Sequence, residues 1–211
     1  MPEKIQKNTP EARLSGILSG HHTAERNGIR VHNIEILEPA STADDPRFHR
    51  VSVAETPENS ALLGSLPEHP SVKDGERTYL QVEGFIMETP SGSLLLSADK
   101  IRTTSAEKAA DDNAARITGT ISRVTPYKNG YSSVITRTQP VKAEIPFFIQ
   151  GDEAARISKD KISQGAQVTI EGKLMSATML GPGGKRINYM TVQARSVKLA
   201  KRLENRRQVK I

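Results

Sequence analysis

The chain lacks cysteine, tryptophan and any long hydrophobic run. Its 211 residues contain no Cys, which excludes disulfide bonds and thiolate metal sites. No stretch approaches the roughly 18 apolar residues of a transmembrane helix. The N-terminal segment MPEKIQKNTP lacks the apolar core of a signal peptide. We therefore expect a soluble, cytoplasmic protein without membrane contact.

Motifs for catalysis are also missing. There is no Cys nucleophile, no G-x-S-x-G and no H-E-x-x-H motif, and the acidic residues are scattered along the chain. His21, His22, His32 and His49 have no acidic or Cys partner at metal-ligand spacing. We expect no enzymatic activity, no cofactor and no metal, and instead expect these histidines to contact a backbone phosphate.

Charge is distributed unevenly along the chain. Residues 1–106 contain 11 Lys and Arg against 15 Asp and Glu, whereas residues 107–211 contain 19 against 9. Hydrophobic residues make up only 36% of the chain, which indicates long loops or tails. A basic half joined to an acidic half indicates that one module faces a polyanion and the other need not.

Residues 115–200 have the pattern of five strands and one short helix. The expected strands cover 115–123, 131–138, 143–150, 167–175 and 187–197, with a helix over 153–157. Apolar and polar residues alternate over 167–175, as in a half-buried strand. Asn129-Gly130 indicates a hairpin, because both residues tolerate positive φ, and Asp152 is a candidate N-cap. This element order is that of an OB-fold, a five-stranded barrel whose open face often holds nucleic acid.

The same pattern occurs earlier in the chain. Four blocks match in the same order: 12–19 with 115–122, 27–28 with 129–130, 79–86 with 167–174, and 94–101 with 190–197. The repeat predicts an all-β fold with short helices, built of two tandem OB-fold five-stranded barrels. The expected parts are a flexible arm (1–10), an N-terminal barrel (11–102), a linker (103–114), a C-terminal barrel (115–200) and a basic tail (201–211). Thr104 and Glu107 fit a capping box for a short helix in the linker.

Residues 115–200 resemble the bacterial single-stranded-DNA-binding protein family. The resemblance is carried by Phe147-Phe148, the acidic and Ala-rich segment 152–155, the V-T-I-E-G-K-L run at 168–174, G-G-K-R at 183–186 and V-Q-A at 192–194. It implies a protein that binds single-stranded DNA largely independently of sequence, during replication, recombination or transfer. Two barrels per chain imply a homodimer with four barrels, and replication or recombination proteins as partners.

Two features depart from the family pattern. The family commonly stacks bases on tryptophan, which this chain lacks, and commonly ends in an acidic tip that recruits partners. Here the last residues are basic, which suggests a specialised relative, plasmid- or phage-encoded.

An aromatic platform among cations predicts the nucleic-acid site. Ile145, Phe147 and Ile149 alternate inward, so Phe148 points to the polar face, where it either stacks a base or covers a core edge or subunit contact. The predicted contact residues are Arg123, Tyr127, Lys128, Tyr131, Arg137, Lys142, Phe148, Lys173, Lys185, Arg186 and Tyr189. The Gly-rich run at 181–186 does not have phosphate-loop spacing. It is expected to form a hairpin tip that wraps nucleic acid, or a flexible loop.

Two other functions remain open on the sequence. The first half has few aromatic residues (Phe48, Tyr79 and Phe85), which favours a protein–protein adaptor in a replication or conjugation complex. RNA is the other alternative, because stacking and charge do not distinguish it from DNA.

Overall fold

The computed structural model describes residues 11–42, 46–73, 75–90, 92–127, 129–157, 159–180 and 186–200. Within these residues the strands are β1 (Ala12–Arg26), β2 (Ile29–Leu37), β3 (Phe48–Ala54), β4 (Tyr79–Glu88), β5 (Leu94–Thr103), β6 (Asn113–Tyr127), β7 (Gly130–Arg137), β8 (Ala143–Gln150), β9 (Gln167–Leu180) and β10 (Arg186–Leu199). The helices are α1 (Ser60–Ser65), α2 (Ala106–Ala109), α3 (Asp152–Arg156) and the 3-10 helix η1 (Lys159–Ile162). No helix in this described part is long and apolar enough to cross a membrane.

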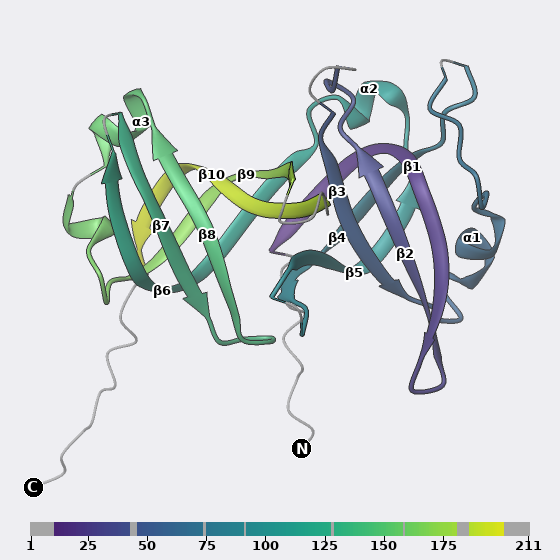
Figure 1. Cartoon of the computed structure of the whole chain (residues 1–211), viewed down its shortest axis with the longest axis horizontal. Coiled ribbons are helices and arrows are strands. Elements are labelled where there is room, and N and C mark those ends of the chain that lie inside the picture. The colour runs from purple at the N-terminus through teal and green to yellow at the C-terminus, as the bar shows by residue number, and fades with distance from the viewer. Residues whose placement is uncertain are drawn as a thin grey trace, which may run out of the picture.

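The strands form two five-stranded barrels that lie side by side (Figure 1). The sheet order is β2-β3-β5-β4-β1 in the first half and β6-β7-β8-β10-β9 in the second, and pairings β1–β2 and β6–β9 close each barrel. In each half the third strand pairs in parallel with the fifth, β3 with β5 and β8 with β10. The prediction of an all-β fold with the OB-fold strand order in both halves is confirmed.

Alternating burial explains why these segments form strands. In β8, Ala143, Ile145, Phe147 and Ile149 are buried, while the residues between them are exposed or half-buried. The same period of two holds in β10, where Met190, Val192 and Ala194 are buried as predicted. Because period-two side chains point to opposite faces, each strand contributes one row to a barrel interior and one row to its surface.

The internal repeat marks positions where strands approach closely. Gly84 in β4 and Gly172 in β9 occupy the same place in the repeat. A Cβ on Gly84 would lie 1.9 Å from the Ser97 carbonyl oxygen, and a Cβ on Gly172 would lie 2.0 Å from that of Gln193. No side chain fits at that distance, so both barrels need glycine where the fourth strand crosses the fifth.

Three local predictions were wrong in detail. Tyr127 pairs with Gly130, so Gly130 belongs to strand β7 rather than to the predicted turn, and it makes a close backbone approach to β8. The N-cap of α3 is Gly151, with φ 65°, and Asp152 is the first helical residue. In α2 the capping side chain is that of Ser105, which accepts a hydrogen bond from the backbone N–H of Lys108.

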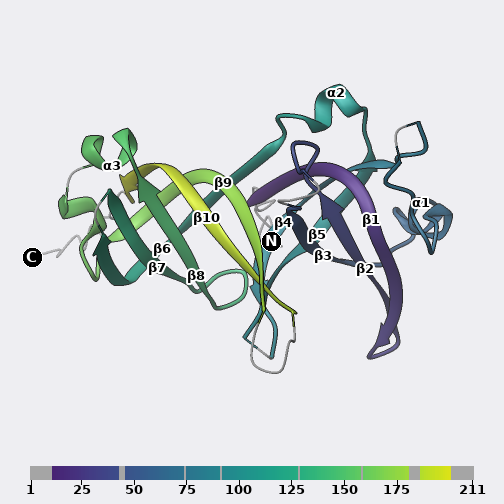
Figure 2. The same ribbon diagram turned by 45° about the horizontal axis from the view of Figure 1, so that its top comes forward.

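The barrels are joined through the starts of β1 and β6, at the centre of the molecule in Figure 2. Ala12 pairs with Ala115, Arg13 with Ala114 and Leu14 with Asn113, in antiparallel register. Ala12 and Ala115 are equivalent in the repeat, so the junction relates the two barrels by an approximate two-fold axis. Each barrel therefore presents the same edge to the other.

Candidate nucleic-acid interface

One row of side chains crosses the outer surface of the second barrel. The row consists of Thr125 (β6), Ser132 (β7), Phe148 (β8), Gln193 (β10) and Lys173 (β9), which are neighbours in register. Thr125 and Ser132 are exposed, whereas Phe148, Gln193 and Lys173 are half-buried. The structure therefore places an aromatic ring in a polar row on the outside of the barrel, as the alternation in β8 predicts.

The surface continues on one side of this row. There Arg123 is exposed and pairs with Val134, which pairs with Pro146. On the same side, beyond Pro146, Thr191 donates a hydrogen bond of 2.8 Å to the Pro146 carbonyl, and β9 and β10 run on as a two-stranded ribbon. Tyr189 on this ribbon is 49% exposed. We call this whole surface, from Arg123 through Phe148 to Tyr189, the outer face.

Both signs of charge lie near the outer face. Arg123 and Lys142 are exposed cations, and Lys173 is half-buried. The exposed Glu144 lies at the hairpin end of β8, where its backbone N–H donates to a carboxylate oxygen of Glu88 from the first barrel at 3.4 Å. Arg123 and Lys173 thus lie on the two sides of Phe148, while Lys142 lies with Glu144 at the hairpin end of β8, nearest the first barrel.

Tyr131 does not share the outer face with Phe148. It pairs with the buried Ile149, has the inward parity of β7 and packs against the core. Its ring lines a cavity of about 400 Å³ beside Pro126 and Ala154, near α3. The predicted cluster of Tyr131 with the surrounding cations is therefore split between two surfaces.

Arg137 was predicted as a contact residue, and this is wrong because its side chain is only 1% exposed. Its guanidinium donates to the Ile86 carbonyl, lies 3.4 Å from the Glu11 carboxylate and stands 5.8 Å from the Phe85 ring centre. Glu11 also accepts from the Ile86 N–H at 3.3 Å. We call Glu11, Phe85, Ile86 and Arg137 the Arg137 joint, since they connect the barrels. Arg137 has the inward parity of Ile135 in β7, which was the sequence signal for its burial.

Burial dominates the electrostatics of the Arg137 joint. It raises the pKa of Glu11 to about 7, although the Arg137 charge and the Ile86 N–H both oppose this shift. It also lowers the pKa of Arg137, against the opposing charge of Glu11. The pair is therefore a structural contact between barrels rather than a cation offered to a ligand.

Four predicted contacts cannot be placed on the outer face. Lys128 and Lys185 lie outside the described residues, as do the side chains of Tyr127 and Arg186. The expected arm (1–10) and basic tail (201–211) also lie outside them. Residues 181–185 of the predicted hairpin tip also lie outside the described residues, although the ribbon that leads to them is described as far as the pair Leu180–Arg186.

The predicted phosphate contact is wrong for two of the histidines. His32 and His49 are 2% and 0% exposed. His32 lies 3.1 Å from a Glu55 oxygen and 2.9 Å from the stacked His21 ring, so it bonds within the first barrel. Among the residues that the structure describes, no group of three or more His, Asp and Glu side chains has the geometry to hold a metal ion.

Sequence reasoning missed several polar and apolar residues of the outer face. Gln193, Thr191 and Met175 lie beside the predicted contacts in the register of β9 and β10. Their alternation with the buried Val192 and Leu174 was a signal that could have found them.

Comparison with known proteins shows a shared fold. No protein-family model matches the chain, and no curated protein sequence matches it. The structure is similar to a deletion mutant of the single-stranded DNA binding protein from Thermus aquaticus, with a TM-score of 0.63 and 14% identity over 90% of this chain and 93% of that one. A fission yeast Pot1 structure with ssDNA is more distant, with a TM-score of 0.30 and 10% identity over 95% and 87% of the two chains. The first likeness extends over most of both barrels.

Proposed function

We propose that the chain binds single-stranded DNA with little sequence preference, on the outer face of the second barrel. The observation that carries this is Phe148, an accessible ring in a polar row with Arg123 and Lys173 on either side. A base stacked on an aromatic side chain contributes about 1–3 kcal/mol, and every base can stack. The fold shared with the Thermus aquaticus protein supports the proposal.

The outer face suits a strand of any sequence. Phe148 and Tyr189 offer rings for stacking, and the cations Arg123, Lys142 and Lys173 suit the phosphate backbone. The hydroxyl and amide groups between them can donate or accept hydrogen bonds. Such binding would protect or organise single strands during replication, recombination or transfer, and a homodimer would present four barrels.

The test is a titration of the full chain with matched labelled oligo-dT, duplex DNA and RNA, followed by fluorescence anisotropy. We expect micromolar or tighter binding of oligo-dT at low salt, and a steep loss as salt rises, because bound counterions are released from the strand. Absence of oligo-dT binding at low salt would contradict the proposal. Tighter binding of RNA than of oligo-dT would indicate that the outer face binds RNA.

A protein partner is a second candidate function for the first barrel alone. At the position equivalent to Phe148 this barrel has Ser52, and its Phe85 ring is already in contact with Arg137. The position equivalent to Phe148 therefore carries no aromatic ring in the first barrel. A pull-down with nuclease treatment tests this candidate, because only contacts that survive the nuclease are protein-mediated.

A further inference from the structure

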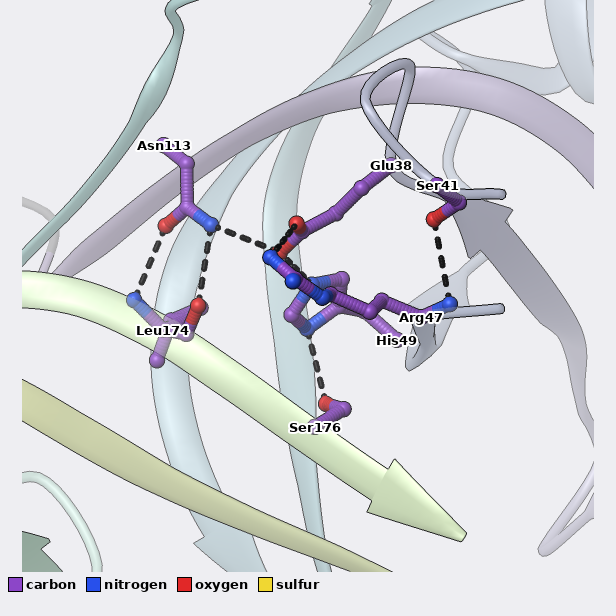
Figure 3. Close-up of polar contacts among 7 residues, drawn as sticks. All are labelled: Glu38, Ser41, Arg47, His49, Asn113, Leu174 and Ser176. Carbon is purple, nitrogen blue, oxygen red and sulfur yellow. Dashed lines mark hydrogen bonds and ion pairs between the residues drawn. The ribbon is translucent and has the colours of Figure 1, made fainter. Parts of the chain in front are cut away.

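A second polar joint connects the barrels on the other side of the two-fold axis. It consists of Glu38, which follows β2, His49 on β3, Asn113 at the start of β6 and Ser176 on β9, and we call it the Asn113 joint (Figure 3). All four side chains are linked by hydrogen bonds to each other or to the backbone of β9. The first barrel supplies Glu38 and His49, so the joint ties that barrel to a strand of the outer face.

Asn113 continues the sheet at the edge of β9. Its side-chain amide donates to the Leu174 carbonyl and accepts from the Leu174 N–H, both at 2.9 Å. These two bonds replace the pairing that β6 gives to β9 only as far as Gly172. The same amide donates to Glu38 at 3.1 Å, which fixes its orientation.

His49 connects Glu38 of the first barrel to Ser176 on β9 through its two ring nitrogens. Its Nε2 lies 2.7 Å from Glu38 Oε1, and its Nδ1 lies 2.8 Å from Ser176 Oγ. Burial opposes ionisation of Glu38, but the His49 hydrogen bond and the nearby charges of His49, Arg47 and Lys173 outweigh it and lower the pKa of Glu38. An ionised Glu38 only accepts, so His49 Nε2 carries a proton and donates it. His49 is 0% exposed, so this Ser–His–Glu arrangement lies within the contact between the two barrels.

The Asn113 joint holds the strand that carries part of the outer face. Leu174 and Ser176 alternate along β9 with Lys173, Met175 and Ala177. In register, Lys173 stands beside Gln193, and Ala177 beside Tyr189. Fixing one side of β9 therefore fixes where Lys173 and Tyr189 stand relative to Phe148.

We propose that Glu38, His49, Asn113 and Ser176 are positioning residues, through which the first barrel sets the β9–β10 ribbon for nucleic-acid binding. This rests on the proposed function. The first barrel then contributes to affinity without touching the strand. Lys173 links the Asn113 joint to the outer face. Its charge helps to lower the pKa of Glu38, and it lies in the row that contains Gln193 and Phe148.

The Arg137 joint provides the matched control. Ile86 and Leu174 are equivalent in the repeat, and each has its backbone N–H and carbonyl bonded by side chains at the junction. The Arg137 joint bonds to β4 of the first barrel, whereas the Asn113 joint bonds to β9. A substitution in the Arg137 joint therefore perturbs the junction between the barrels without acting on the β9–β10 ribbon.

The binding test compares Ser176→Ala, Ser176→Thr and Glu11→Gln in the full chain. Ser176→Ala removes the hydroxyl bonded to His49, and we expect oligo-dT affinity to fall about two- to tenfold, the range for one hydrogen bond. Ser176→Thr keeps the hydroxyl and should restore affinity, and Glu11→Gln should leave it within about twofold. Equal losses in Ser176→Ala and Glu11→Gln would overturn the positioning role, because they would indicate a general loss of stability.

A double-mutant cycle asks whether the joint acts through the ribbon. The Ser176→Ala effect should shrink in a Tyr189→Ala background, where a ribbon contact is already lost. It should persist in an Arg123→Gln background, because Arg123 lies on β6. Equal persistence in both backgrounds would contradict action through the ribbon.

Hydrogen exchange of the free protein separates this inference from the proposed function. Ser176→Ala and Asn113→Ala should accelerate amide exchange in residues 173–177 and 189–193, and leave β7 unchanged. Unchanged exchange in both variants would overturn the Asn113 joint as a positioning device. Failure of the wild type to bind oligo-dT would instead overturn the proposed function, and the exchange result would still decide what holds the ribbon.

Discussion

The two barrels have the same strand order and differ in the side chains on their outer surfaces. Ser52 in β3 stands where Phe148 stands in β8, since each pairs with the second and fifth strands of its own barrel in the same row. Phe85 likewise stands where Lys173 stands. The repeat is kept in the core and at close backbone approaches, and it is lost where side chains point outward. This difference is the reason why we propose nucleic-acid contact for the second barrel rather than for the first.

The two joints show the same divergence at equivalent positions. Glu38 occupies in the first barrel the place of Arg137 in the second, counted from the equivalent Ile36 and Ile135. One joint satisfies the backbone of Ile86 with a buried ion pair, and the other satisfies Leu174 with an amide. A charged joint and an amide joint should respond differently to mutation and to pH.

The largest expected effect is on stability, from Arg137→Met. Removing one partner of a buried ion pair costs about 3–5 kcal/mol, because the carboxylate of Glu11 is left buried without its opposite charge. The cost should be larger at pH 8 than at pH 6, since Glu11 with a pKa of about 7 is mostly neutral at the lower pH. Urea unfolding measures this, with Glu38→Gln as the comparison. A larger loss of stability in Glu38→Gln would show that the Asn113 joint contributes more to stability than the Arg137 joint.

Glu11 should make the protein less stable as pH rises. Its pKa is raised from 4.5 to about 7 in the folded chain, so its contribution is fully present below pH 4.5 and is lost as pH rises through 7. At about 1.4 kcal/mol per pKa unit, the wild type should lose up to roughly 3 kcal/mol over this range relative to Glu11→Gln. Glu38, whose pKa is lowered, has the opposite sign: its contribution is lost as pH falls below 4.5.

The check is urea unfolding of the wild type and Glu11→Gln at several pH values between 4.5 and 8. Parallel curves for the two proteins would show that Glu11 titrates as an ordinary carboxyl in the folded chain.

Phe148→Ala should weaken binding of oligo-dT by about 1–3 kcal/mol, the contribution of one stacked base. Ser52→Ala at the equivalent position should leave affinity unchanged, because the first barrel offers no ring there. Anisotropy titrations of both variants at one salt concentration measure the difference. An unchanged affinity for Phe148→Ala would indicate that Phe148 covers a core edge or a subunit contact instead of stacking on a base.

Alternation in the sequence predicts the strands and most of the outer face, but not how the barrels meet. Phe148 could be placed outward because its neighbours Phe147 and Ile149 are apolar on both sides. In β7, polar residues occupy both faces, so the inward parity of Tyr131 and Arg137 is weak as a pattern. The partners of Arg137 lie in the first barrel, and only the junction of β1 with β6 brings them together.

The smallest expected effect concerns salt dependence. Each phosphate contact on a single strand adds about 0.7 to the slope of log K against log salt. Lys173→Gln and Arg123→Gln should each lower this slope by roughly that amount. Lys100→Gln in the first barrel, where Lys100 pairs with Glu83 at 3.6 Å, should not change it. Titrations at four salt concentrations resolve the slopes, and an equal drop for Lys100→Gln would extend the strand's path onto the first barrel.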